Sequence, residues 1–61
     1  MCNMIFIKQR LNDVLIMNES LKLITEFRDS SFVVENDRIL VKQGEKTLVD
    51  LPYSCVAIMY N

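Results

Sequence analysis

The sequence predicts an all-β fold, a small antiparallel β-barrel or sandwich of about six to seven short strands, forming a single domain over residues 1–61. Short runs rich in β-branched and aromatic side chains recur along the chain, and such runs are typical of strands. Polar turn signals separate these runs at near-even spacing, which is the pattern of small barrels and sandwiches. A chain of 61 residues has room for one domain only.

The N-terminal half begins with two expected strands. Residues 2–8 are apolar and rich in β-formers, and residues 14–17 form a second apolar run. Between them lies a polar segment that ends in Asn12-Asp13, a common turn signal.

Residues 18–28 fit two patterns. In a strand, one face would carry the side chains of Leu21, Leu23, Thr25 and Phe27. A helix would collect on one face Met17, Leu21, Ile24 and Phe27. The alternative fold is therefore α+β, with a helix near residues 14–28.

The C-terminal half predicts four further strands, at residues 31–35, 38–42, 46–51 and 55–60. Asn36-Asp37 and Gly44 supply the turns between the first three, because both tolerate a positive φ. In the third strand, we expect Thr47, Val49 and Leu51 to share a face. Pro52 interrupts the pattern, since proline cannot donate to a strand ladder. The last strand is apolar on both faces, which predicts burial on two sides, with the second cover supplied by another subunit.

The composition predicts self-association and argues against nucleic-acid binding and against a membrane span. Apolar residues make up 51% of the chain, more than so small a domain can easily bury alone, so we expect a homodimer. The net charge of −1 and the pI near 5.1 disfavour nucleic-acid binding. No apolar run is long enough to span a membrane, and the start lacks a basic signal-peptide region. We therefore expect a cytoplasmic protein.

Known catalytic motifs are missing from the sequence. Histidine is absent, which removes the commonest general base and the commonest metal ligand. Gly44 is the only glycine, so no glycine-rich phosphate loop exists. The scattered acidic residues are expected on the solvated surface: Asp29, Glu35, Asp37, Glu45 and Asp50. We expect that the protein is not an enzyme.

Cys2 is open to two interpretations. It is either a small apolar residue of the first strand or a metal ligand. If Met1 is removed, the free amine of Cys2, the thiolate of Cys2 and the backbone nitrogen of Asn3 would form a planar N,N,S set that suits Ni(II) or Cu(II). A two-fold axis would supply the second half of such a site. Cys55 is expected in the core, and a Cys2–Cys55 disulfide is not expected in a reducing cytosol.

A surface for single-stranded RNA is the weakest of the binding hypotheses. Its candidate residues are Phe27, Tyr53, Tyr60, Lys22 and Arg28. The acidic pI argues against it.

The sequence resembles the CooT family of small nickel-binding proteins. The start Met1-Cys2, the segment at residues 15–19 and the strand–loop–strand ending at residues 46–60 carry this resemblance. The central Phe/Leu-Gly-Glu turn of the family is replaced here by residues 35–38. The resemblance implies a β-barrel homodimer that binds nickel through Cys2 near the dimer axis and handles nickel for enzymes such as carbon monoxide dehydrogenase. It also favours a strand over a helix at residues 18–28.

Two functional hypotheses follow from the sequence. The first is a homodimer that holds Ni(II) through Cys2 and Asn3, for storage or for delivery to a nickel-enzyme client. The second is a metal-free protein-interaction module, with RNA binding ranked below both.

Overall fold

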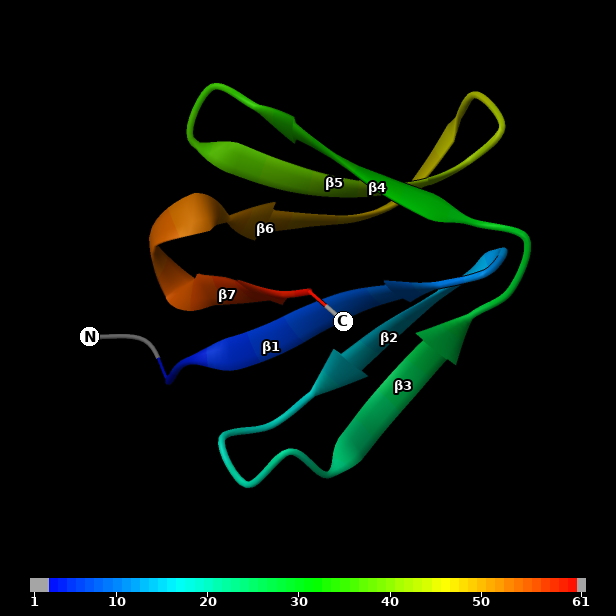
Figure 1. The fold of residues 1–61 in the computed structure, drawn as a ribbon. Helices are drawn as coiled ribbons and strands as arrows, with labels where there is room; N and C mark the ends of the chain where they lie inside the picture. The colour runs from blue at the N-terminus through cyan, green and yellow to red at the C-terminus, as the bar shows by residue number, and fades with distance from the viewer. Residues whose placement is uncertain (1–2, 61) are drawn as a thin grey trace.

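The computed structural model describes residues 3–60, and almost all of its regular structure is β (Figure 1). The seven strands are β1 (Ile5–Arg10), β2 (Asp13–Met17), β3 (Leu23–Phe27), β4 (Ser31–Glu35), β5 (Arg38–Gln43), β6 (Lys46–Pro52) and β7 (Val56–Met59). One 3-10 turn, η1 (Tyr53–Cys55), joins β6 to β7. The all-β prediction is confirmed. The alternative helix near residues 14–28 is wrong, because β2 and β3 occupy that segment.

The strands form two sheets that face each other as an open sandwich rather than a closed barrel (Figure 1). The first sheet has the order β3-β2-β1-β7, and the second has the order β4-β5-β6. Four of the five strand pairings are antiparallel, as expected, whereas β1 and β7 pair in parallel. This exception arises because β7 returns from the second sheet to the edge of the first. No helix among residues 3–60 is long and apolar enough to cross a bilayer.

Three of the four hairpins close with a two-residue turn, and each of these turns begins with a positive φ. The first residues of these turns are Leu11 (φ 54°), Asn36 (φ 55°) and Gly44 (φ 64°). A positive φ at the first central residue alone is the pattern of a type II′ turn, whose twist matches that of the flanking strands. Gly44 suits this conformation because it has no Cβ, and Asn36 suits it because its short polar side chain can hydrogen-bond locally, whereas Leu11 has neither advantage.

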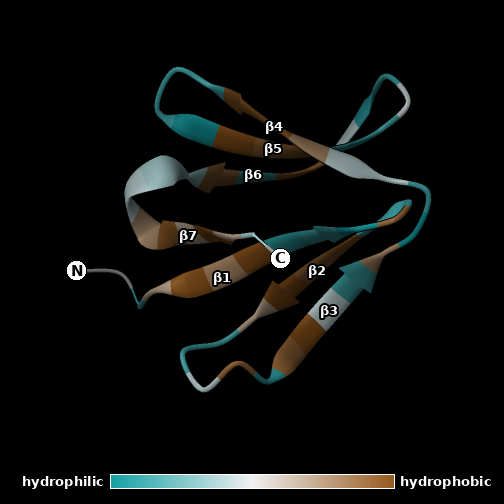
Figure 2. Cartoon of the chain, in the orientation of Figure 1, coloured by the Kyte–Doolittle hydropathy of each residue, from teal (hydrophilic) through white to brown (hydrophobic). Residues whose placement is uncertain are grey.

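The core lies between the sheets and contains six buried side chains: Ile7, Val14, Ile16, Ile39, Val41 and Val56. Four of them lie at alternate positions along β2 and β5, because successive side chains of a strand point to opposite faces, and β1 and β7 each contribute one. The brown segments of these strands in Figure 2 carry this apolar pattern. In β7, Val56 is buried and the other three residues are half-buried. The cover predicted for the second face of this strand is that of another subunit.

Two β-bulges change which side chains share a face. In β3, Ile24 is an extra residue between the pairs Ile16–Thr25 and Met17–Leu23. Leu23 therefore turns to the face opposite Thr25, which corrects the expected alternation of this strand. In β6, an extra residue separates Thr47 from Val49 in the same way. Thr47 consequently does not share the face of Val49 and Leu51, as the sequence pattern had predicted.

Candidate functional site

The predicted metal ligands, Cys2 and Asn3, lie at the N-terminal end of the chain. Cys2 is outside the described residues 3–60. Asn3 is exposed and comes directly before Met4 and β1. The described part of the site therefore begins at Asn3.

Asn3 lines an open hollow of about 390 Å³ between the start of β1 and the β2–β3 loop. Met4 and Ile5 form its side on β1, and Asn18, Glu19, Ser20 and Ile24 form the other side. A thioether, a carboxylate, two amides and a hydroxyl thus line one hollow beside the N-terminus. Carboxylates and thioethers are both metal ligands, the first for hard ions and the second for soft ones.

The loop side of this hollow is held by hydrogen bonds to Asn18. The Oδ1 atom of Asn18 accepts hydrogen bonds from the backbone N–H of Ser20 (2.9 Å) and of Lys22 (3.0 Å). Leu21 has a φ of 62° within this tight loop. The Asn18 side chain is therefore committed to shaping the loop, whereas the Glu19 carboxylate is exposed and has no hydrogen-bond partner among residues 3–60.

A complete metal site is not found in the described part of the chain. Within residues 3–60, no three His, Cys, Asp or Glu side chains come together in a group that could hold a metal ion. A site at this end of the molecule would need Cys2 or a second chain to complete its ligand set.

Cys55 corrects one expectation from the sequence. It is half-buried at the end of η1 and is disulfide-bonded, where a reduced core cysteine had been expected. Its sulfur lies 4.0 Å from the Ser54 hydroxyl oxygen. The chain has one other cysteine, Cys2, which is outside the described residues. A thiolate is the form of cysteine that binds metals, and Cys2 is the only other cysteine with which Cys55 can form a disulfide. Metal binding by Cys2 therefore has to be measured on the reduced protein.

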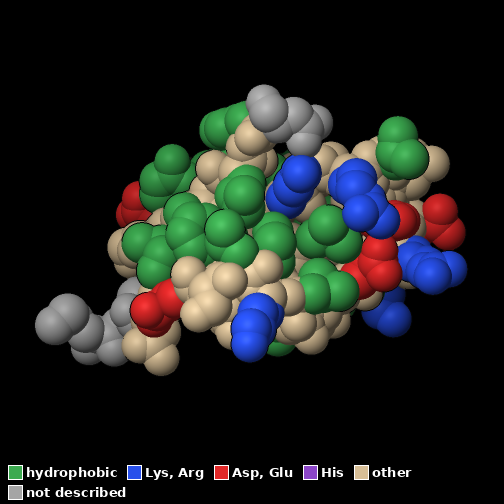
Figure 3. All heavy atoms as spheres, turned by 60° about the horizontal axis from the view of Figure 1, so that its bottom comes forward, with side chains coloured by type: hydrophobic (Ala, Val, Ile, Leu, Met, Phe, Trp, Pro, Cys, Tyr) green, Lys and Arg blue, Asp and Glu red, His purple; other side chains and the backbone are tan. Residues whose placement is uncertain are grey.

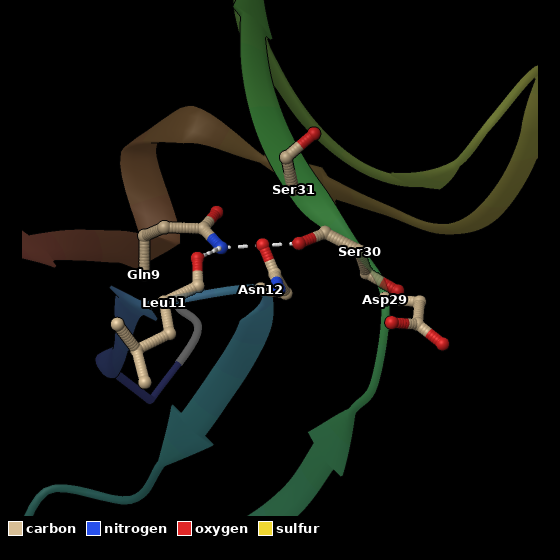
Figure 4. A pocket seen from close by; sticks show the side chains of 6 residues that line it. All are labelled: Gln9, Leu11, Asn12, Asp29, Ser30 and Ser31. Atoms are coloured by element: carbon tan, nitrogen blue, oxygen red, sulfur yellow. Dashed lines mark hydrogen bonds between the residues drawn. The ribbon is translucent and has the colours of Figure 1, made fainter.

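A second, polar hollow of about 560 Å³ lies at the opposite end of β1 (Figure 4). The Gln9 amide nitrogen donates there to the backbone oxygens of Leu11 (3.1 Å), Asp13 (3.0 Å) and Ser30 (3.0 Å). The buried Ser30 hydroxyl donates to the Arg28 carbonyl at 2.8 Å. No buried side-chain nitrogen or oxygen among the described residues lacks a hydrogen-bond partner. These polar groups tie the β1–β2 turn to the crossing between the two sheets.

The remaining polar candidates from the sequence lie on the surface. The five scattered carboxylates are all exposed: Asp29, Glu35, Asp37, Glu45 and Asp50. Asp50 forms an ion pair with Arg38 at 2.7 Å. Of the aromatic residues considered for RNA stacking, Phe27 packs against the core, and only Tyr53 and Tyr60 are exposed.

The outer face of the four-stranded sheet is mostly apolar, and its charged residues, Lys8, Arg10, Asp13 and Glu26, lie toward one end of β1, β2 and β3. Of the strands in this sheet, the sequence had predicted two apolar faces only for the last one. Six outward side chains define this outer apolar face: Phe6, Leu15, Met17, Leu23, Ala57 and Met59. Figure 3, which turns the underside of Figure 1 toward the viewer, shows hydrophobic side chains gathered across the middle of this side of the molecule. The signal in the sequence was the apolar character of both faces of β1, β2 and β7.

The outer face of the three-stranded sheet is different in character. Alternation from the buried Ile39 and Val41 gives this face mostly charged and polar side chains: Ser31, Glu35, Arg38, Lys42, Thr47 and Asp50, with Val33 and Leu40 among them. The two outer faces of the sandwich thus differ sharply in polarity.

No protein-family model matches the sequence, and neither a curated protein nor a solved structure matches it. The assignment of function therefore depends on the residues and on their arrangement in the fold.

Proposed function

We propose that the chain is a non-catalytic Ni(II)-binding protein that acts as a homodimer and stores nickel or delivers it to a nickel enzyme. Cys2 supplies the thiolate, and Asn3 supplies a backbone nitrogen beside it. The observation that supports this site is the hollow next to Asn3, where the Met4 thioether and the exposed Glu19 carboxylate are available as further donors.

The donor chemistry suits nickel better than a hard cation. A thiolate with an amine and a backbone nitrogen forms a tetragonal ligand set, which Ni(II) and Cu(II) prefer. Removal of Met1 frees the amine of Cys2, whose ordinary pKa allows a metal to displace its proton near neutral pH. A single chain offers an incomplete set, and a second chain completes it.

Nickel titration of the reduced protein tests this proposal. The protein lacking Met1 is kept in a non-coordinating reductant, and a thiolate-to-nickel charge-transfer band is followed by absorbance. Cys2→Ala removes the proposed ligand, whereas Cys55→Ser retains Cys2 and prevents any disulfide at Cys55. We expect the band in the wild type and in Cys55→Ser, and its loss in Cys2→Ala. An equal band in Cys2→Ala overturns the proposal.

Glu19 provides a second test of the same site. Glu19→Gln keeps the size of the side chain but removes its charge, so it should weaken nickel binding several-fold. Glu45→Gln, on the exposed β5–β6 turn, is the matched control and should leave binding unchanged.

The second candidate function is a metal-free protein-interaction module. It is favoured by the outer apolar face, on which Leu23 is exposed and the other five side chains are half-buried, because accessible apolar patches commonly mark interaction sites. Under this hypothesis, self-association persists in Cys2→Ala and in the presence of a chelator, and nickel changes neither the mass nor the stability of the protein.

A further inference from the structure

The outer apolar face is organised in two rows that run across all four strands of its sheet. The strand register places Leu23, Met17, Phe6 and Ala57 side by side in the first row, on β3, β2, β1 and β7. The second row contains Glu26, Leu15, Lys8 and Met59 in the same strand order. Paired residues of neighbouring strands share a face. The first row is entirely apolar, and the second places one charge on each side of Leu15.

The two charged side chains of the second row have opposite signs and lie on the two strands that flank β2. Lys8 is on β1, and Glu26 is on β3. Both side chains are half-buried among apolar neighbours. Two copies of the sheet that met face to face around a two-fold axis along β2 would place β1 of each copy over β3 of the other. Lys8 would then meet Glu26 of the second copy, twice.

Other two-fold arrangements of the same faces do not make this pairing. An axis across the strands places β1 over β1, so that Lys8 and Glu26 stay apart. An axis between β1 and β2 places Lys8 over Leu15 of the second copy. The charge pattern therefore selects the axis along β2. This axis also brings Met17 and Leu15 against their own copies and Phe6 against Leu23.

The two longest extents of the chain, 30 and 24 Å, set an upper limit of about 700 Å² on one face. Around this axis, β3, β2 and β1 of one copy cover β1, β2 and β3 of the other, and β7 lies outside the overlap. The two faces therefore bury less than about 1,400 Å² together, which is the size of a small, reversible interface. The pair Arg10–Asp13 lies at the ends of β1 and β2, beyond the second row. Charged side chains at the margin of an apolar patch are typical of interfaces.

We propose that the outer apolar face of the four-stranded sheet binds a second copy of the chain, around a two-fold axis along β2 that pairs Lys8 of each copy with Glu26 of the other. The inference rests on the homodimer of the proposed function, but it does not involve the metal. It assigns the dimer interface to the face of a sheet, away from the exposed edge of β4 and from the polar face of the three-stranded sheet.

Charge exchange tests the pairing directly. Lys8→Glu leaves two carboxylates at each contact, and Glu26→Lys leaves two ammonium groups, so each variant should raise the dimer dissociation constant at least ten-fold. An equimolar mixture of the two variants restores both contacts and should form a heterodimer close to wild-type affinity. Lys42→Glu, which makes the same charge change on the polar outer face, is the matched control and should have no effect.

The measurement is sedimentation equilibrium with a chelator and a reductant present, and circular dichroism confirms that each variant is folded. Recovery of association in the mixture supports the pairing, because a contact within one chain cannot be repaired by a second variant. A wild type that remains monomeric without metal overturns the inference, while nickel binding is judged by the separate titration. A dimer that tolerates both charge changes also overturns the inferred interface, because such a dimer uses another surface. The homodimer of the proposed function would then remain, without this interface.

Discussion

Ile7 offers the sharpest test of the packing between the two sheets. It is fully buried in the middle of β1, between Ile16 on β2 and Ile58 on β7. Ile7→Ala removes three carbon atoms, which costs about 2.4 kcal/mol in transfer free energy. Strands on both sides hold the neighbouring side chains in place, so an unfilled cavity of about 50 Å³ adds about 1.2 kcal/mol. We expect a total loss of about 3.5 kcal/mol.

This loss is large for a chain of this size. A domain of 61 residues has a free energy of unfolding of about 3–9 kcal/mol. The melting temperature of Ile7→Ala should therefore fall by about 14–28 °C. Ile24→Ala is the matched control, since it removes the same atoms from a side chain that is 55% exposed. It should cost about 1 kcal/mol, because less apolar area is lost and no cavity forms.

Urea unfolding followed by circular dichroism measures both variants. The chain concentration must be the same in all samples, since dimerisation makes apparent stability depend on concentration. Each variant is measured in the oxidised and in the reduced state, because Cys55 is disulfide-bonded. If Ile7→Ala costs no more than Ile24→Ala, the inner face of β1 is not the centre of the core, and the reasoning from burial is refuted.

Three further predictions concern a turn, the hydrogen bonds of the Gln9 side chain and a surface ion pair. Leu11→Asn should raise the free energy of unfolding by about 0.5–1 kcal/mol, and Asn36→Leu should lower it similarly, because both positions have a positive φ that Asn tolerates better; melting temperatures that shift in the same direction would contradict this. Gln9→Glu should lower the free energy of unfolding in urea by about 3 kcal/mol at neutral pH, since a carboxylate cannot donate to the three carbonyls. A loss under about 0.5 kcal/mol would show that the Gln9 hydrogen bonds are unimportant for stability. Asp50→Asn should cost less than about 1 kcal/mol, and less still in high salt, because the pair with Arg38 is about half exposed; a salt-independent loss above about 2 kcal/mol would refute this.

The strands of the second sheet could be predicted closely from the sequence. β4 has the expected bounds, and β5 extends one residue beyond them. β4 is a short apolar run before Asn36, and β5 is a second run between Asn36 and Gly44. Both of these turn residues adopt the positive φ that their turns require. Local chemistry was sufficient here because each signal lies within a few residues of the structure that it determines.

The bulges and one of the turns could not be predicted in this way. Ile24 and Leu48 are ordinary apolar residues, and nothing in their chemistry marks them as extra residues in a ladder. The register of a strand against its neighbour decides this, and a single sequence does not contain that information. Leu11 was not expected to adopt a left-handed conformation, because leucine is a poor residue there.

The candidate site was only partly accessible from the sequence. Cys2 and Asn3 could be selected by residue type, but the neighbours of Asn3 at Asn18, Glu19 and Ser20 depend on the path of the β2–β3 loop. The outer apolar face was predicted only at the last strand, and its extent over the other three strands was missed for a related reason. Its rows combine residues of β3, β2, β1 and β7, and the parallel pairing of β1 with β7 follows from the return of the chain between the sheets.

That parallel pairing has a consequence for how the protein reaches its folded state. β1 leaves the ribosome before any other strand, while β7, its neighbour on one side, is made last. Until then, one edge of β1 and the apolar side chains around Ile7 have no cover from β7. Non-local pairings of this kind slow folding and expose strand edges to other chains. Completion of the first sheet therefore waits until β7 has been made, and the newly made chain is most prone to aggregate just before this strand docks.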